Sequence, residues 1–237
     1  MDSRKKTARS AGLIYLVVII CGTLYLQYIP SQLKLKAHPT AVLQNIMASQ
    51  FMFKLCIVFE LLCWVFFLIL PVLLYRLFKS VNNTCAKLML FFAVVQVPLA
   101  FVNLLNKFAI LVLIDRSDYL NVFSTEQLNA QLLFYLNLYS KGNLINQIFW
   151  GLWLFPFGYL VFKSNFIPKI IGIFLMAGCM GYLIDFAATL FFPAFNKNLI
   201  ADYITLPASL GEIGICLWFI IIGIKEKQML VNSSLNN

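Results

Sequence analysis

The sequence predicts an all-α protein, a polytopic membrane helix bundle with about six transmembrane helices and two short amphipathic interfacial helices on the outer side. Composition is the first reason. Hydrophobic residues make up 62% of the 237 residues and charged residues only 11%, against about 45–50% and about 25% in soluble domains. The second reason is that the apolar residues form runs of about 20 residues, enough to cross a hydrocarbon core of about 30 Å.

The apolar runs place six spans along the chain. They cover residues 9–29, 51–77, 86–113, 143–163, 167–192 and 204–224. Residues 1–8 form a basic tail, residues 225–237 a polar tail, and we expect one transmembrane domain over 9–224. The first run is longer than the apolar part of a signal peptide, and no small-x-small cleavage site precedes Pro30, so it counts as a span.

Two connecting segments have the pattern of amphipathic helices. In residues 38–50 the apolar side chains Val42, Leu43, Ile46 and Met47 form one stripe, which is typical of a helix lying on a membrane surface. Residues 124–143 begin with a capping-box pair, Ser124 and Gln127, and we expect this second helix to end near Gly142.

Most of the 18 basic residues flank one side of the predicted spans. They lie in the N-terminal tail, in the connection after span two, in the turn between spans four and five, and after span six. The positive-inside rule makes this side cytoplasmic. We therefore expect a multi-pass protein of the bacterial inner membrane, with both termini cytoplasmic and both amphipathic segments outside.

Three stretches carry a resemblance to a known family: "ARSAGLIYL" near the start, "INQIFWGLWLFPFGYLVFKSNFIPKIIGIFLMAGCMGYLIDF" in the middle and "LPASLGEIGICLW" near the end. Together they resemble the bacterial integral-membrane family catalogued as domain of unknown function 4386. The resemblance spans about residues 8–224 and implies a multi-pass membrane fold without a known activity. Members often have a histidine near the start or middle of span four, where this chain has Tyr139, Ser140 and Trp153.

Two carboxylates inside predicted spans are the most informative polar residues. Asp185 lies about 10 Å from the outer end of span five, and Glu212 about 12 Å from the outer end of span six. Because consecutive spans joined by a short loop pack antiparallel, we expect these carboxylates to face one another and to share a proton. Tyr182, one helical turn before Asp185, is placed to orient it.

The other polar residues of the spans also fall in the predicted outer half. Span two contributes Glu60 and Lys54, span three contributes Asn103, Asn106 and Lys107 on one face, and span four contributes Asn146 and Gln147. We expect them to line a polar cavity with Asp185, Glu212 and Tyr182. Charged groups near the bilayer centre cost about 2.5–3.5 kcal/mol on insertion scales, which makes this set the best candidate for ligand or proton binding.

Three interpretations follow, and the sequence leaves all of them open. The cavity could bind or pass a small or lipid-like ligand, or a carboxylate could serve an intramembrane enzyme as general acid or base. The charges could also belong to a structural or accessory protein and only fix helix packing. We expect membrane lipids but no nucleic acid as partners, because the basic residues lie at the ends of apolar runs. We expect no cofactor or metal, because the chain has no phosphate-binding loop and a single histidine, His38. The missing nucleophile elbow also disfavours an enzyme that acts through a known motif.

Overall fold

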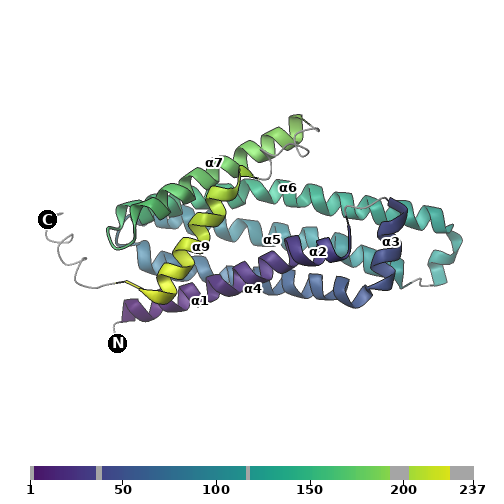
Figure 1. The fold of residues 1–237 in the computed structure, drawn as a ribbon, viewed down its shortest axis with the longest axis horizontal. Coiled ribbons are helices and arrows are strands. Elements are labelled where there is room, and N and C mark those ends of the chain that lie inside the picture. Colours follow the sequence, from purple (N-terminus) through teal and green to yellow (C-terminus); the bar gives the residue numbers. More distant parts are fainter. Residues whose placement is uncertain (1–2, 36–38, 116–117, 193–202, 225–237) are drawn as a thin grey trace. The chain divides into compact units, whose positions relative to one another are not determined.

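The computed structural model describes residues 3–35, 39–115, 118–192 and 203–224, and the described residues are almost entirely helical. The elements are α1 (Ser3–Thr23), the π-helical segment η1 (Leu24–Tyr28), α2 (Ile29–Gln32), α3 (Pro39–Ala48), α4 (Gln50–Phe78), α5 (Asn83–Ile114), the 3₁₀ segment η2 (Asp118–Val122), α6 (Thr125–Lys163), α7 (Lys169–Phe191) and α9 (Leu206–Ile221) (Figure 1). The predicted tail over 225–237 and His38 lie outside the described residues.

Five helical stretches are long and apolar enough to cross a membrane. Among the described residues they are Arg4–Gln32, Gln50–Phe78, Asn83–Ile114, Thr125–Lys163 and Lys169–Phe191. The first four contain the first four predicted spans, and the fifth lies within the predicted span 167–192. The sixth predicted span corresponds to α9, which is apolar but has only 16 residues. The all-α membrane-type fold is therefore confirmed.

The chain divides into two compact units, which we describe separately. Unit 1 contains Met1–Val17, Phe66–Gln96 and Ile145–Asn237, and unit 2 contains Val18–Val65 and Val97–Leu144. The helices α1, α4, α5 and α6 each contribute residues to both units. The single domain expected over residues 9–224 stays a prediction.

In unit 1, α7 and α9 pack closely, as the green and yellow helices of Figure 1 show. Small residues bring the two backbones together. A Cβ on Gly178 would meet the Cα of Ala208 at 2.6 Å, and a Cβ on Gly211 would meet the side chain of Leu175 at 2.9 Å. Both glycines therefore set the spacing of these helices, as small residues do in other membrane bundles.

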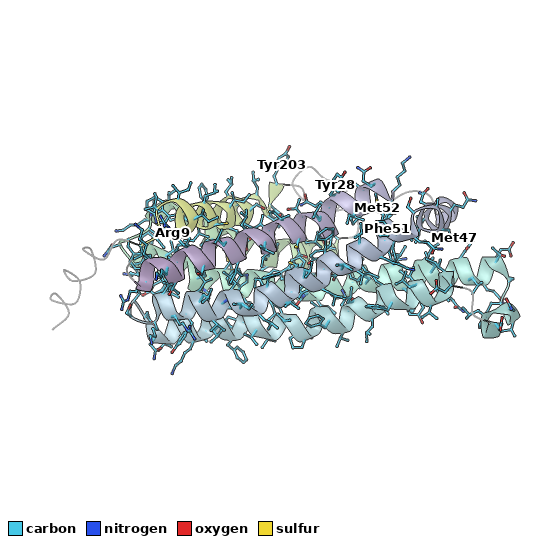
Figure 2. The ribbon with its side chains drawn as sticks, turned by 90° about the horizontal axis from the view of Figure 1, so that it is seen from below. Arg9, Tyr28, Met47, Phe51, Met52 and Tyr203 are labelled. Atoms are coloured by element: carbon cyan, nitrogen blue, oxygen red, sulfur yellow. The ribbon has the colours of Figure 1, made fainter. Side chains whose placement is uncertain are left out.

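In unit 2, α3 is the first predicted amphipathic segment, and it runs across the direction of α4 (Figure 1). Val42 and Ile46 are buried on one side of α3, whereas Met47 is 39% exposed. Nearby, Tyr28 and Phe51 are 55% and 75% exposed, and both extend outward from the helices with Met47 (Figure 2). Outward-facing apolar side chains are the surface that a lipid environment requires.

The second amphipathic segment is not a separate interfacial helix, which corrects the prediction. It is the first part of α6, which runs without a break from Thr125 to Lys163. The capping box is present, because the Ser124 amide donates to Gln127 Oε1 at 2.8 Å and the Gln127 amide donates to Ser124 Oγ at 3.2 Å. Gly142 does not end the helix. Its missing side chain instead leaves room for Asn103 of α5.

Candidate functional site

Unit 2 contains a buried ion pair between α4 and α5. Lys107 Nζ lies 2.6 Å from Glu60 Oε2, and the two side chains are 3% and 1% exposed. The hydroxyl of Tyr139, on α6, donates toward both Glu60 oxygens at 2.9 Å. The Lys107 ammonium also lies 4.2 Å from the centre of the Tyr139 ring and 3.4 Å from Cys56 Sγ. Each charge in this cluster therefore has several partners.

The asparagines of α5 extend this network. Asn103 is buried, and its Nδ2 donates to the Tyr139 carbonyl and to Asn143 Oδ1, both at 3.0 Å. Asn106 Nδ2 donates to Asn103 Oδ1 at 3.1 Å and to the Asn103 carbonyl at 2.9 Å. Asn103, Asn106 and Lys107 thus lie on one face of α5, as their spacing predicts.

The π-helical segment η1 packs beside the same pair. Tyr25 of η1 is 3% exposed, and its ring centre lies 5.5 Å from the Lys107 ammonium. The Tyr25 carbonyl accepts a hydrogen bond from Cys56 Sγ at 3.4 Å. Pro30 follows within one turn and has no N–H, so the regular ladder of hydrogen bonds cannot continue through this region. The irregular backbone therefore lies next to the buried charges, where π-helical turns are often found.

Unit 1 contains the other two acids, and their partners differ. Glu212 of α9 accepts a hydrogen bond at 2.8 Å from the hydroxyl of Tyr15, a residue of α1 that is 1% exposed. Asp185 of α7 accepts a hydrogen bond at 2.5 Å from Nε2 of Gln147, on α6. Both carboxylates are half-buried. Neither forms an ion pair with any residue that the structure describes.

The packing of α7 on α9 places these two acids at different levels. Gly178 lies against Ala208 and Leu175 against Gly211, so the part of α7 opposite Glu212 is near residue 174. Asp185 is about eleven residues farther along α7, which corresponds to about 16 Å of helix. The two carboxylates therefore do not face one another directly across the helix contact, although the sequence suggested matching depths.

Tyr182 lies between these two levels on α7. Its ring packs edge to face on Trp150 of α6, with centres 6.1 Å apart. The orienting role expected of Tyr182 toward Asp185 stays a prediction.

Asn146, one residue before Gln147 on α6, is the least satisfied polar side chain of the predicted set. It is 2% exposed, and neither Nδ2 nor Oδ1 has a hydrogen-bond partner among the described residues. Most buried side-chain amides have a partner, which can be protein, water or a ligand. The Asn146 amide is therefore free to accept and donate one.

The structure thus divides the predicted site residues between two clusters. Glu60, Lys107, Asn103 and Asn106 belong to unit 2, whereas Asp185, Glu212, Tyr182, Asn146 and Gln147 belong to unit 1. Lys54 is exposed on α4 and makes none of the Glu60 contacts described above. In the described part of the chain, no group of three or more His, Cys, Asp and Glu side chains could hold a metal ion.

Three tyrosines contact the charged residues through their hydroxyls or rings but were not among the predicted site residues. They are Tyr15, Tyr25 and Tyr139. A tyrosine in an apolar span has no local pattern that separates a packing role from a hydrogen bond to a distant acid. Counting acids against bases inside the spans could have indicated that neutral donors were needed for the acids in excess.

One family of proteins matches almost the whole chain. Residues 10–223 match the family described as "Domain of unknown function (DUF4386)". The chain belongs to this family. An uncharacterised protein of Archaeoglobus fulgidus is 30% identical over 86 residues, which is 36% of this chain and 49% of that protein. The chain therefore spans about half the length of that relative. No solved structure matches this chain.

Proposed function

We propose that this membrane protein binds a positively charged group at Asp185 and Glu212, and that the group is the ammonium of a small or lipid-like ligand or a proton. The observation that carries this proposal is the contrast in partners. Glu60 has a lysine, whereas Asp185 and Glu212 have only neutral donors, the Gln147 amide and the Tyr15 hydroxyl. Ionisable groups inside membrane spans are expensive and usually serve a function.

Two further features support binding in unit 1. Along α7, Tyr182 lies between the level of Asp185 and that of Glu212, so a cationic group could move from one carboxylate to the other past its hydroxyl. The unpartnered amide of Asn146 could hydrogen-bond to a polar part of the same ligand. The proposal places the site in the outer leaflet of a bacterial inner membrane, with both chain termini cytoplasmic, as the distribution of basic residues favours.

The proposal is tested with two cationic probes on the full chain in phosphatidylcholine nanodiscs or vesicles. Ethanolamine, compared with uncharged glycerol, should raise the thermal unfolding midpoint of the wild type, because a ligand that binds only the folded state stabilises it. The second probe is the proton. The protein is placed in vesicles that contain a pH-sensitive dye, and the rate at which the interior acidifies after a pH step is measured.

The variants Asp185→Asn and Glu212→Gln should abolish the response to at least one probe. Glu126→Gln is the matched control, because Glu126 is an exposed acid in the first turn of α6 and should leave both responses unchanged. If neither ethanolamine nor the proton distinguishes the wild type from Asp185→Asn and Glu212→Gln, the proposed function is wrong.

A further inference from the structure

Unit 1 also has an apolar groove, which neither Asp185 nor Glu212 lines. Its volume is about 470 Å³, it is open on one side, and it exposes only apolar atoms. Leu88 and Phe92 of α5, Phe155 and Tyr159 of α6, and Met180 and Leu183 of α7 line it. All three helices are among those long and apolar enough to span a membrane. An occupant can therefore enter directly from the lipid phase.

The lining explains which part of a molecule would fit. A groove without polar atoms offers no hydrogen bond to a soluble metabolite, whereas a hydrocarbon chain needs none. The α6 wall runs from Leu152 to Tyr159, which is about 10 Å of helix and long enough for a substantial part of one acyl chain. The groove alone could not select among lipids, because an acyl chain is equally well accommodated in the bilayer.

The end of the groove supplies the selectivity. Tyr159 lines it close to the end of α6, and an exposed lysine lies beside this tyrosine. Lys163, the last residue of α6, has its ammonium 5.9 Å from the centre of the Tyr159 ring. Lys169 begins α7 with its ammonium 5.4 Å from the Phe162 ring centre.

Negative side chains are missing from the helix termini that carry these lysines. The first turn of α7 contains no acidic residue. Lys163 and Lys169 form no ion pair with any residue in the described part of the chain. A negatively charged group near this end would therefore meet uncompensated positive charge, and basic residues next to spans attract anionic lipids.

We infer that the groove holds one acyl chain of an anionic phospholipid, whose headgroup phosphate lies at Lys163. This inference does not use Asp185 or Glu212 and is independent of the cation site proposed above. It differs from general lipid contact because it specifies one groove, one kind of headgroup and one lysine.

The test uses the full chain with an equimolar mixture of phosphatidylglycerol and phosphatidylcholine. Native mass spectrometry measures the fraction of protein that retains one lipid of each kind. The wild type should prefer phosphatidylglycerol. The variant Lys163→Gln should lose about fivefold of this preference, because one lysine near a membrane surface contributes about this factor to the binding of an anionic lipid.

The variant Leu88→Trp fills the groove from a side chain that is 45% exposed, so it should reduce retention of both lipids without disturbing the interior. Ile173→Trp is the matched control, because Ile173 of α7 is also 45% exposed and does not line the groove. Lys6→Gln, at an exposed lysine of α1, controls for a general loss of positive charge.

Cys85 gives a second readout of occupancy. It lines the groove and is half-buried, whereas the other five cysteines are buried. Phosphatidylglycerol should slow its alkylation by N-ethylmaleimide more in the wild type than in Leu88→Trp. Equal retention of the two lipids by the wild type, or equal retention by Leu88→Trp and Ile173→Trp, would overturn the inference.

Discussion

The acids of unit 2 and unit 1 occupy similar apolar helices but have opposite surroundings. Glu60 is 1% exposed and contacts a lysine and a tyrosine hydroxyl, and its lysine in turn contacts a thiol and two aromatic rings. Glu212 and Asp185 are half-buried, and the structure gives each one neutral hydrogen-bond donor. The contrast shows that the residue type alone does not indicate how the charge of an acid in an apolar helix is compensated.

The physical difference lies in what compensates the charge. A buried ion pair offsets the cost of desolvation only when both ions are well coordinated, and Glu60 with Lys107 meets this condition. A carboxylate with only neutral donors remains able to bind a cation. We therefore interpret the Glu60 cluster as the packing element that holds α4, α5 and α6 together in unit 2, and the acids of unit 1 as the binding element.

The largest effect is expected from breaking the ion pair. Lys107→Met leaves Glu60 buried without its cation and should lower the free energy of unfolding by about 3–5 kcal/mol. Thermal unfolding in detergent measures the change. Lys54→Met is the control, since an exposed lysine should change stability by less than about 0.5 kcal/mol.

A double variant sharpens this prediction. Glu60→Gln/Lys107→Met removes both charges and should recover much of the stability that Lys107→Met loses, because no buried charge remains unpaired. If Lys107→Met is no less stable than Lys54→Met, Glu60 and Lys107 do not form the pair described.

A smaller loss is expected from Tyr139→Phe. This change removes the hydroxyl that donates to Glu60 and keeps the ring near Lys107, so it should cost about 1.5–3 kcal/mol, as for a hydrogen bond to a charged group. Tyr135→Phe, one turn earlier on α6, is the control. A loss equal to that of the control would mean that Glu60 does not depend on this donor.

These contacts also show what the sequence could predict. Hydropathy located all five long helices, and the i, i+3, i+4 spacing placed Asn103, Asn106 and Lys107 on one face, because both depend on local pattern. The partners of the acids depend on contacts between distant segments. Tyr139 and Glu60 are 79 residues apart, and Tyr15 and Glu212 are 197 apart, so no local signal connects them.

The second amphipathic segment illustrates a related limit. Glycine is both a helix terminator and a residue that allows close helix packing, and the sequence around Gly142 does not distinguish these roles. Asn103 of α5 decides between them, because it fills the space that a side chain at position 142 would need. The register of α7 on α9 was missed for the same reason, since it is set by Gly178 and Gly211.

In unit 1, Tyr15→Phe should have a weaker effect than Tyr139→Phe. It removes one hydrogen bond to Glu212, and the loss should be about 1.5 kcal/mol, the lower end of the range for a charged acceptor, because Glu212 is half-buried whereas Glu60 is 1% exposed. The ring, whose centre lies 6.3 Å from that of Trp153, is retained. Thermal unfolding of the two phenylalanine variants compares the stability that unit 2 loses without the Tyr139 hydroxyl with the stability that unit 1 loses without the Tyr15 hydroxyl. A loss at Tyr15 larger than at Tyr139 would reverse the assignment of packing and binding roles.

The smallest effect on stability is expected from Asp185→Asn. An asparagine oxygen can still accept the hydrogen bond from Gln147, so the free energy of unfolding should change by less than about 1 kcal/mol. The charge is lost, however, and so should be the response to ethanolamine or to the proton. A variant that keeps its stability and loses its response separates binding from packing in the same molecule. If Asp185→Asn instead destabilises the protein as much as Lys107→Met, then Asp185 has a structural role. The acids of the two units would then differ in their hydrogen-bond and ion-pair partners but not in their role.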